Sequence, residues 1–163
     1  MLLLSRLWKK RRQRHQLRSW MLETQTALAK RVRTLAEQEQ LEMENDFTLR
    51  FELMILLVSD QMVTLRRQGG DQAAERIQGL WTVTFEGFDA SLRDQGVNDI
   101  RIGKRMHKLI GHGSGRRKAY VEALENNDLE SLRDSIARNV LNGAQSDDTR
   151  IDPILAELSS LND

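Results

Sequence analysis

The sequence predicts an all-α protein: a compact bundle of about five to six helices with a long basic helix or arm at its N-terminus. Apolar residues recur at spacings of three and four along nearly the whole chain, and no stretch alternates as a strand would. The chain has a single proline, Pro153, which is compatible with long helices because proline inside a helix costs about 3 kcal/mol. Its 163 residues provide for one domain and one core.

Residues 1–45 are predicted to form a basic amphipathic helix or arm, with the helix starting near Ser5 and extending to about Glu44. Residues 1–20 carry seven arginines and lysines and no acidic residue. Leucines and a tryptophan beside such a basic run are typical of a segment at an anionic membrane surface. The candidate membrane-proximal residues are Leu4, Leu7, Trp8, Lys9, Lys10, Arg11 and Arg12.

Helices are expected next over about residues 48–67 and 71–95. The first has a wide apolar face, which predicts a central position, and it ends at Gly69-Gly70. Asp71 is a good N-cap for the second. Gly96 suits the left-handed conformation that follows a helix end.

The following helix is expected to start with Asp99 as its cap and to be interrupted at residues 111–115. Three glycines in those five residues raise the entropic cost of staying helical. Helicity should resume from Arg116 to Leu124. A turn at residues 126–128 then precedes the last strong helix.

These helices make up a predicted helical domain over residues 46–143. Residues 144–163 form an acidic tail, in which residues 144–150 have the composition of a linker. Asp152-Pro153 can begin a short helix there, since proline suits the first turn.

No group of residues predicts catalysis, a cofactor or a metal. Cysteine is absent, which excludes disulfides, thiolate ligands and a cysteine nucleophile. His15, His107 and His112 have no metal-binding spacing. The glycine run at residues 111–115 lacks the preceding strand and the Gly-Lys-Ser/Thr of a phosphate loop. We therefore expect a non-enzymatic protein without a small-molecule substrate.

A second basic cluster leaves two interpretations open. Arg101, Lys104, Arg105 and Lys108 share one helix face, and residues 116–118 are also basic. The face is either solvated or in contact with nucleic acid. The alternative function is thus a ribosome- or RNA-binding adaptor that uses the basic N-terminal arm, whose binding would fall steeply with salt.

Residues 88–106 resemble the signature of the ubiquinol–cytochrome c chaperone family, in which Leu-Arg-Glu-x-Gly-Val-x-Asp is followed by an apolar residue and Gly-Lys. Here the segment from Leu92 to Asp99 and the pair Gly103-Lys104 carry the pattern. The other similar segments are Arg50-Phe51-Glu52-Leu53-Met54, Gly115-Arg116 with Ala119-Tyr120, and Arg138-Asn139-Val140-Leu141. Their order and spacing hold from about residue 46 to 142.

The resemblance implies an all-α chaperone that binds cytochrome b, nascent or unassembled, during biogenesis of the cytochrome bc complex. It also implies a small partner protein or ribosome contact. The expected location is the cytoplasmic face of the inner membrane in a bacterium, or the membrane-associated mitochondrial matrix in a eukaryote.

The turn after Gly96 is the predicted recognition surface, because Arg93 can reach Asp99 and leave the next cations projecting. The candidate client- or partner-binding residues are Arg93, Gly96, Asp99, Gly103, Lys104, Arg105, Arg116 and Tyr120. An apolar groove for the client is expected to be lined by Met54, Met62, Trp81 and Phe85, since methionine adapts to varied partners.

Overall fold

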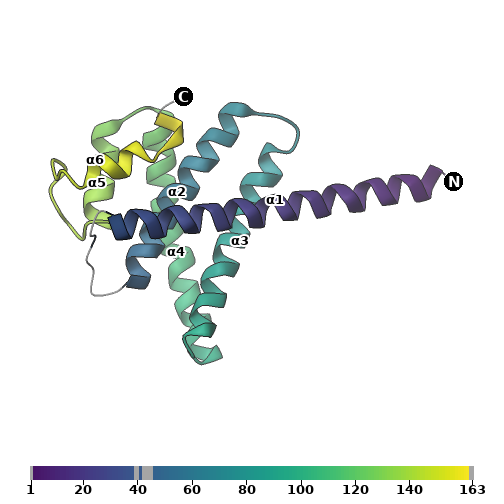
Figure 1. The fold of residues 1–163 in the computed structure, drawn as a ribbon, viewed down its shortest axis with the longest axis horizontal. Coiled ribbons are helices and arrows are strands. Elements are labelled where there is room, and N and C mark those ends of the chain that lie inside the picture. The colour runs from purple at the N-terminus through teal and green to yellow at the C-terminus, as the bar shows by residue number, and fades with distance from the viewer. Residues whose placement is uncertain (1, 39–40, 42–45, 162–163) are drawn as a thin grey trace.

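The computed structural model describes residues 2–38, 41 and 46–161, and all regular structure in them is helical. The elements are α1 (Leu2–Gln38), α2 (Asp46–Gln68), α3 (Ala73–Asp94), α4 (Asp99–Glu125), α5 (Leu129–Asn139), α6 (Ile151–Ala156) and the short 3-10 helix η1 (Ser159–Leu161). Figure 1 shows a helical bundle with α1 extending out of it. The predicted all-α class is confirmed.

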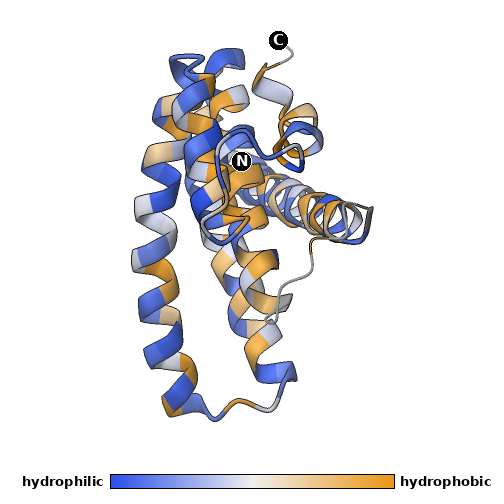
Figure 2. Cartoon of the chain, turned by 90° about the vertical axis from the view of Figure 1, so that its left-hand side faces the viewer, coloured by the Kyte–Doolittle hydropathy of each residue, from blue (hydrophilic) through white to orange (hydrophobic). Residues whose placement is uncertain are grey.

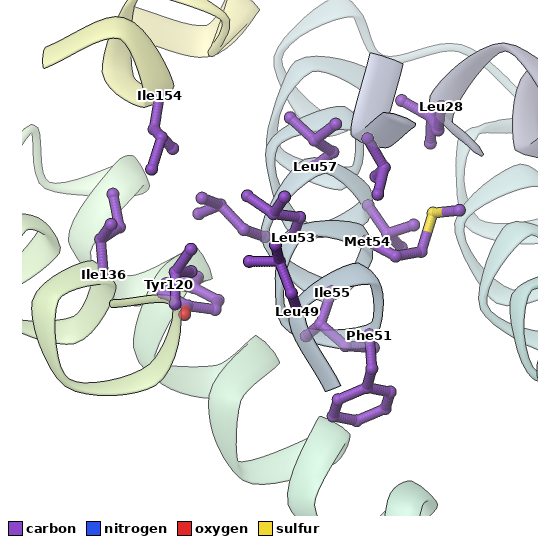
Figure 3. Packing of buried hydrophobic residues seen from close by; sticks show 14 of the residues in the cluster. Leu28, Leu49, Phe51, Leu53, Met54, Ile55, Leu57, Tyr120, Ile136 and Ile154 are labelled. Carbon is purple, nitrogen blue, oxygen red and sulfur yellow. The ribbon is translucent and has the colours of Figure 1, made fainter. Parts of the chain in front are cut away.

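Helix α2 is the centre of the bundle, as its wide apolar face predicts. Every residue from 51 to 60 is buried. Helix α1 crosses α2 and α3 on one face, and α4 packs on the opposite face (Figure 2). Leu53 points towards Tyr120 and Ile136, while Met54 points to the side of Leu28 (Figure 3). A helix that is apolar all round therefore has partners all round.

The predicted interruption at residues 111–115 is wrong, because α4 continues through them. Gly113 is buried in this helix, and a Cβ atom there would lie 2.9 Å from Cζ of Phe85 and 3.3 Å from Cδ1 of Ile55. Glycine therefore lets α4 pack closely on α2 and α3. That packing offsets the cost of about 1 kcal/mol for a glycine in a helix.

The helix ends follow the sequence in part. Gly69 and Gly96 have positive φ angles, 67° and 73°, so both end a helix as predicted. Asp71 is not a cap, since α3 begins after Gln72 without a side-chain cap. At α4 the cap is Asn98, whose side chain accepts the N–H of Ile100 at 2.9 Å, and Asp99 is instead the first helical residue.

The C-terminal segment packs on the bundle. Asp60 of α2 accepts hydrogen bonds from the backbone N–H groups of Ser159 and Ser160, at 3.0 and 2.9 Å, and from Oγ of Ser160 at 2.6 Å. Arg31 of α1 forms an ion pair of 3.2 Å with Glu157. The segment also buries three apolar side chains, Ile151, Ile154 and Leu158. Its polar and apolar contacts together hold it against α1 and α2.

Candidate functional site

A cleft of about 360 Å³ lies where α1 crosses α2 and α3. Its size is within the range of protein ligand sites. The apolar part of its lining consists of Ala29, Val32, Phe47, Met54 and Phe88. All three helices therefore contribute apolar surface to one opening.

Close packing of α1 on α3 shapes this cleft. A Cβ atom at Gly87 would lie 2.8 Å from Nε2 of Gln25, and one at Gly79 would overlap the end of Met21. Both glycines let α1 lie directly on α3. The cleft begins at this contact, since Gln25 and Gly87 both line it.

An aromatic cluster connects the lining of the cleft to the core of the bundle. The ring of Phe88 lies 6.0 Å from that of Phe47, 5.2 Å from that of Phe51 and 5.6 Å from that of Phe85, measured between centroids. Tilted and edge-on pairs at these separations are favourable. The aromatic part of the lining is therefore held in place by packing.

The polar part of the lining is cationic. Arg33 and Arg50 line the cleft together with four uncharged polar residues, Gln25, Thr84, Ser91 and Gln95. No acidic side chain is among the described residues that line it. The opening thus combines an apolar interior with positive charge.

The predicted recognition surface lies beside this cleft, at the corner between α3 and α4. Arg93 donates to Asp89 at 2.7 Å and also pairs with Asp99, as predicted. Hydrogen bonds to these two carboxylates raise the pKa of Arg93. Gly103 and Lys104 are exposed on the first turns of α4. The corner is thus held by Arg93 and leaves Lys104 open to solvent.

Arg105 connects the corner to the cleft. Its guanidinium carbon lies 4.6 Å from the centroid of the Phe47 ring, which lines the cleft. Gln95, another lining residue, is adjacent to Gly96 in the corner. Arg105 is therefore the predicted binding residue that contacts the cleft lining, and Arg93, Gly96, Asp99, Gly103 and Lys104 lie with it in the corner between α3 and α4.

Arg116 and Tyr120 lie elsewhere, in the packed interface of α2, α4 and α5. Arg116 pairs with the buried carboxylate of Glu52. Desolvation raises the pKa of Glu52, and the charge and hydrogen bond of Arg116 oppose this shift. Tyr120 is fully buried and accepts a hydrogen bond of 3.3 Å from Asn139, and its burial raises its pKa. These side chains hold helices together and do not form part of the corner.

Of the four residues predicted to line an apolar groove, three lie outside the cleft. Met62 and Phe85 are buried in the core, and Trp81 is half-buried beneath the guanidinium of Arg117, at 4.5 Å. Only Met54 lines the cleft. Sequence reasoning missed the role of Phe47 and Phe88, whose shared ring cluster depends on how α2 and α3 cross.

The predicted membrane-proximal residues lie on the part of α1 that leaves the bundle. Trp8, Lys9, Lys10, Arg11 and Arg12 are all exposed. The side chains of Leu4 and Leu7 lie outside the described residues. In the described part of the chain no helix combines the length and apolarity of a membrane span, and no cluster of three metal-ligating side chains occurs.

Comparison with known proteins finds a similar fold and a matching family. The fold is similar to the crystal structure of the Cbp3 homolog from Brucella abortus, with a TM-score of 0.61 and 22% sequence identity, over 85% of this chain and 77% of that chain. No curated protein matches the chain significantly. The sequence profile described as ubiquinol-cytochrome C chaperone matches residues 39–160, which contain the corner and the α2 and α3 walls of the cleft. The chain therefore belongs to the ubiquinol-cytochrome C chaperone family.

Proposed function

We propose that this chain is an assembly chaperone that binds cytochrome b before it enters the cytochrome bc complex. Membership of the chaperone family supports a role in assembly of that complex. The observation that carries the proposal is the cleft between α1, α2 and α3, with its apolar interior and cationic edge. An unassembled membrane subunit exposes the kind of surface that such an opening shields.

The energetics favour recognition of a short apolar segment. Each Å² of apolar surface removed from water contributes roughly 25 cal/mol. A cleft of about 360 Å³ holds a few side chains and not a whole transmembrane helix. A small number of buried anchors can nevertheless carry most of the binding energy. Met54 suits the lining of a site for such anchors, because its flexible side chain adapts to different partners.

The corner would set the orientation of the client segment in the cleft. Lys104 is exposed in the corner, and the next residue, Arg105, lies over the ring of Phe47 in the cleft lining. Cations beside an apolar site favour a client segment whose apolar stretch is followed by acidic or carbonyl oxygen groups. The cleft would then supply affinity, and the corner would supply orientation.

A variant that fills the cleft tests this proposal. Ser91→Trp places a large ring in the lining of the cleft, whereas Ala90→Trp places the same ring on the exposed side of α3. Tagged full-length variants are used to capture newly made cytochrome b in cells. We expect Ser91→Trp to lower capture at least about tenfold, or about 1.4 kcal/mol, and Ala90→Trp to leave it unchanged.

The melting temperature of each variant shows whether it is folded. Equal capture by folded Ser91→Trp and Ala90→Trp would exclude the cleft. A second pair, Lys104→Glu and Lys108→Glu, tests the corner in the same assay. Reversal at Lys104 is expected to weaken capture more than reversal at Lys108, and equal effects would show that only net charge matters.

A further inference from the structure

The first part of α1 extends beyond the bundle. Figure 1 shows it running past α3, on the side away from α5 and α6. All residues from 8 to 16 are exposed, and Leu28 is the first of the described α1 side chains to be buried. Half-buried residues begin at Leu17. We call residues 2–16 the arm.

The arm carries charge that the described residues do not neutralise. Lys9, Lys10, Arg11, Arg12 and Arg14 have no ion pair among the residues that the structure describes, whereas Arg18 pairs with Glu86 at 3.2 Å. Cations three and four residues apart repel one another on a helix. An anionic surface would relieve this repulsion.

The two sides of the arm differ. Lys10, Gln13, Arg14 and Leu17 line an open cleft whose other wall contains Asp71 and Glu75, so this side faces the turn between α2 and α3. At 100° per residue, the opposite side of the helix carries Trp8, Arg11, Arg12 and His15. We call these four residues the outer face. It consists of one large aromatic ring, two arginines and a histidine.

The aromatic residue indicates which anionic partner fits. Trp8 is 77% exposed, and leucines at positions 2, 3, 4 and 7 precede it in the sequence. RNA would bind the cations and can stack a base on the indole ring, but it offers no partner for a run of leucines. The boundary of a bilayer suits both parts, because indole rings favour the interface and phosphates attract arginine and lysine.

We propose that the outer face of the arm docks on a membrane surface rich in anionic phospholipids. Trp8 lies at the interface, and Arg11 and Arg12 contact lipid phosphates. The family match begins at residue 39, so this surface is separate from the matched region. It is also independent of the proposed client, since vesicle binding is measured without cytochrome b.

Vesicle flotation with the full chain provides the test. We compare vesicles of phosphatidylcholine with vesicles that also contain phosphatidylglycerol, each at low and high salt. Binding is expected only to the anionic vesicles and should fall with salt. Absence of such binding would overturn the proposal, as would binding of RNA in its place.

Matched pairs of substitutions locate the surface. Arg11→Gln with Arg12→Gln removes two charges from the outer face and keeps good helix propensity. Lys10→Gln with Arg14→Gln removes two charges from the inner side, and Arg101→Gln with Lys108→Gln removes two from α4. The outer pair is expected to lower vesicle partitioning on the order of 10-fold, the inner pair less, and the α4 pair not measurably. Equal losses in all three would overturn the proposal.

Trp8 gives an independent readout. Brominated lipids quench tryptophan fluorescence only at close range. Quenching is expected in the unmodified chain and should be largely lost in Trp8→Phe, because Trp20 and Trp81 are half-buried in the bundle. Quenching that persists unchanged in Trp8→Phe would place another surface at the membrane and overturn the proposal.

Discussion

The guanidinium carbon of Arg105 lies 4.6 Å from the centre of the Phe47 ring, and this contact joins α4 to the start of α2. Phe47 also lines the cleft and packs on Phe88, so Arg105 covers a ring that belongs to the cleft lining. A cation over an aromatic ring contributes about 0.5–1 kcal/mol at a partly exposed site. The predicted recognition corner and the cleft therefore meet at the contact between Arg105 and Phe47.

A double-mutant cycle measures this coupling. Arg105→Ala and Phe47→Leu, alone and together, are compared by urea unfolding. The coupling free energy is expected to be about 0.5–1 kcal/mol. Additive losses within experimental error would show that the contact contributes nothing to stability.

Three glycines of α4 make a sharper test of packing. Gly113→Ala places a Cβ atom 2.9 Å from Phe85 and 3.3 Å from Ile55, whereas Cβ atoms at Gly111 and Gly115 would meet nothing within 4 Å. Overpacking should make Gly113→Ala destabilising by about 1–3 kcal/mol. Gly111→Ala and Gly115→Ala should instead stabilise the protein by up to about 1 kcal/mol, through helix propensity.

Urea or thermal unfolding of the three single variants checks this prediction. The opposite signs are the critical result, because helix propensity alone predicts that all three substitutions stabilise. A stabilised Gly113→Ala would mean that α4 does not approach Phe85 closely.

Arg116 is expected to control the pH dependence of stability through Glu52. Burial raises the pKa of Glu52 above its ordinary value of 4.5, and Arg116 opposes this shift. Arg116→Met leaves the buried carboxylate without its partner, which should cost about 3–5 kcal/mol at neutral pH. It should also raise the pKa of Glu52 in the folded state further.

The sign of the pH effect follows from that raised pKa. The folded state takes up a proton at Glu52 at a higher pH than the unfolded state does, so stability is lost as pH rises through the folded-state pKa. Stability of Arg116→Met should therefore recover, relative to the unmodified protein, as the pH is lowered from 7 towards the ordinary value of 4.5. Urea unfolding across this range measures it. Adding Glu52→Gln should abolish the recovery, and a constant difference at every pH would contradict the account.

Asp60 is predicted to hold the C-terminal segment. Asp60→Ala leaves the two N–H groups and the hydroxyl that it binds on Ser159 and Ser160 without their acceptor. A loss of about 2–4 kcal/mol is expected, because buried donors pay their desolvation cost. Hydrogen exchange should speed up most in residues 151–161. Asp94→Ala, at an exposed position on α3, is the control and should change stability by less than about 0.5 kcal/mol.

The sequence by itself determined the helical class and several of the helix ends. The apolar face of α2 predicts its central position, and Gly69 and Gly96 mark helix ends because a positive φ angle favours glycine. Asp128, the last residue of the predicted turn, caps α5 by accepting the N–H of Ser131 at 3.0 Å. Even the Arg93–Asp99 pair could be predicted, since six residues across a turn restrict its geometry. All of these features depend on neighbours in the chain.

Only the tertiary structure decided which of these residues meet. Three glycines within five residues predict a break, but α4 is continuous there, and Gly113 lies where a Cβ atom would crowd Phe85. Tyr120 and Arg116 belong to the core, and the cleft exists because α1 crosses α2 and α3. Hydrophobic periodicity reports which face of a helix is buried, but it carries no information about the partner or the crossing angle. Those depend on side chains far apart in the sequence, which become neighbours only in the folded chain.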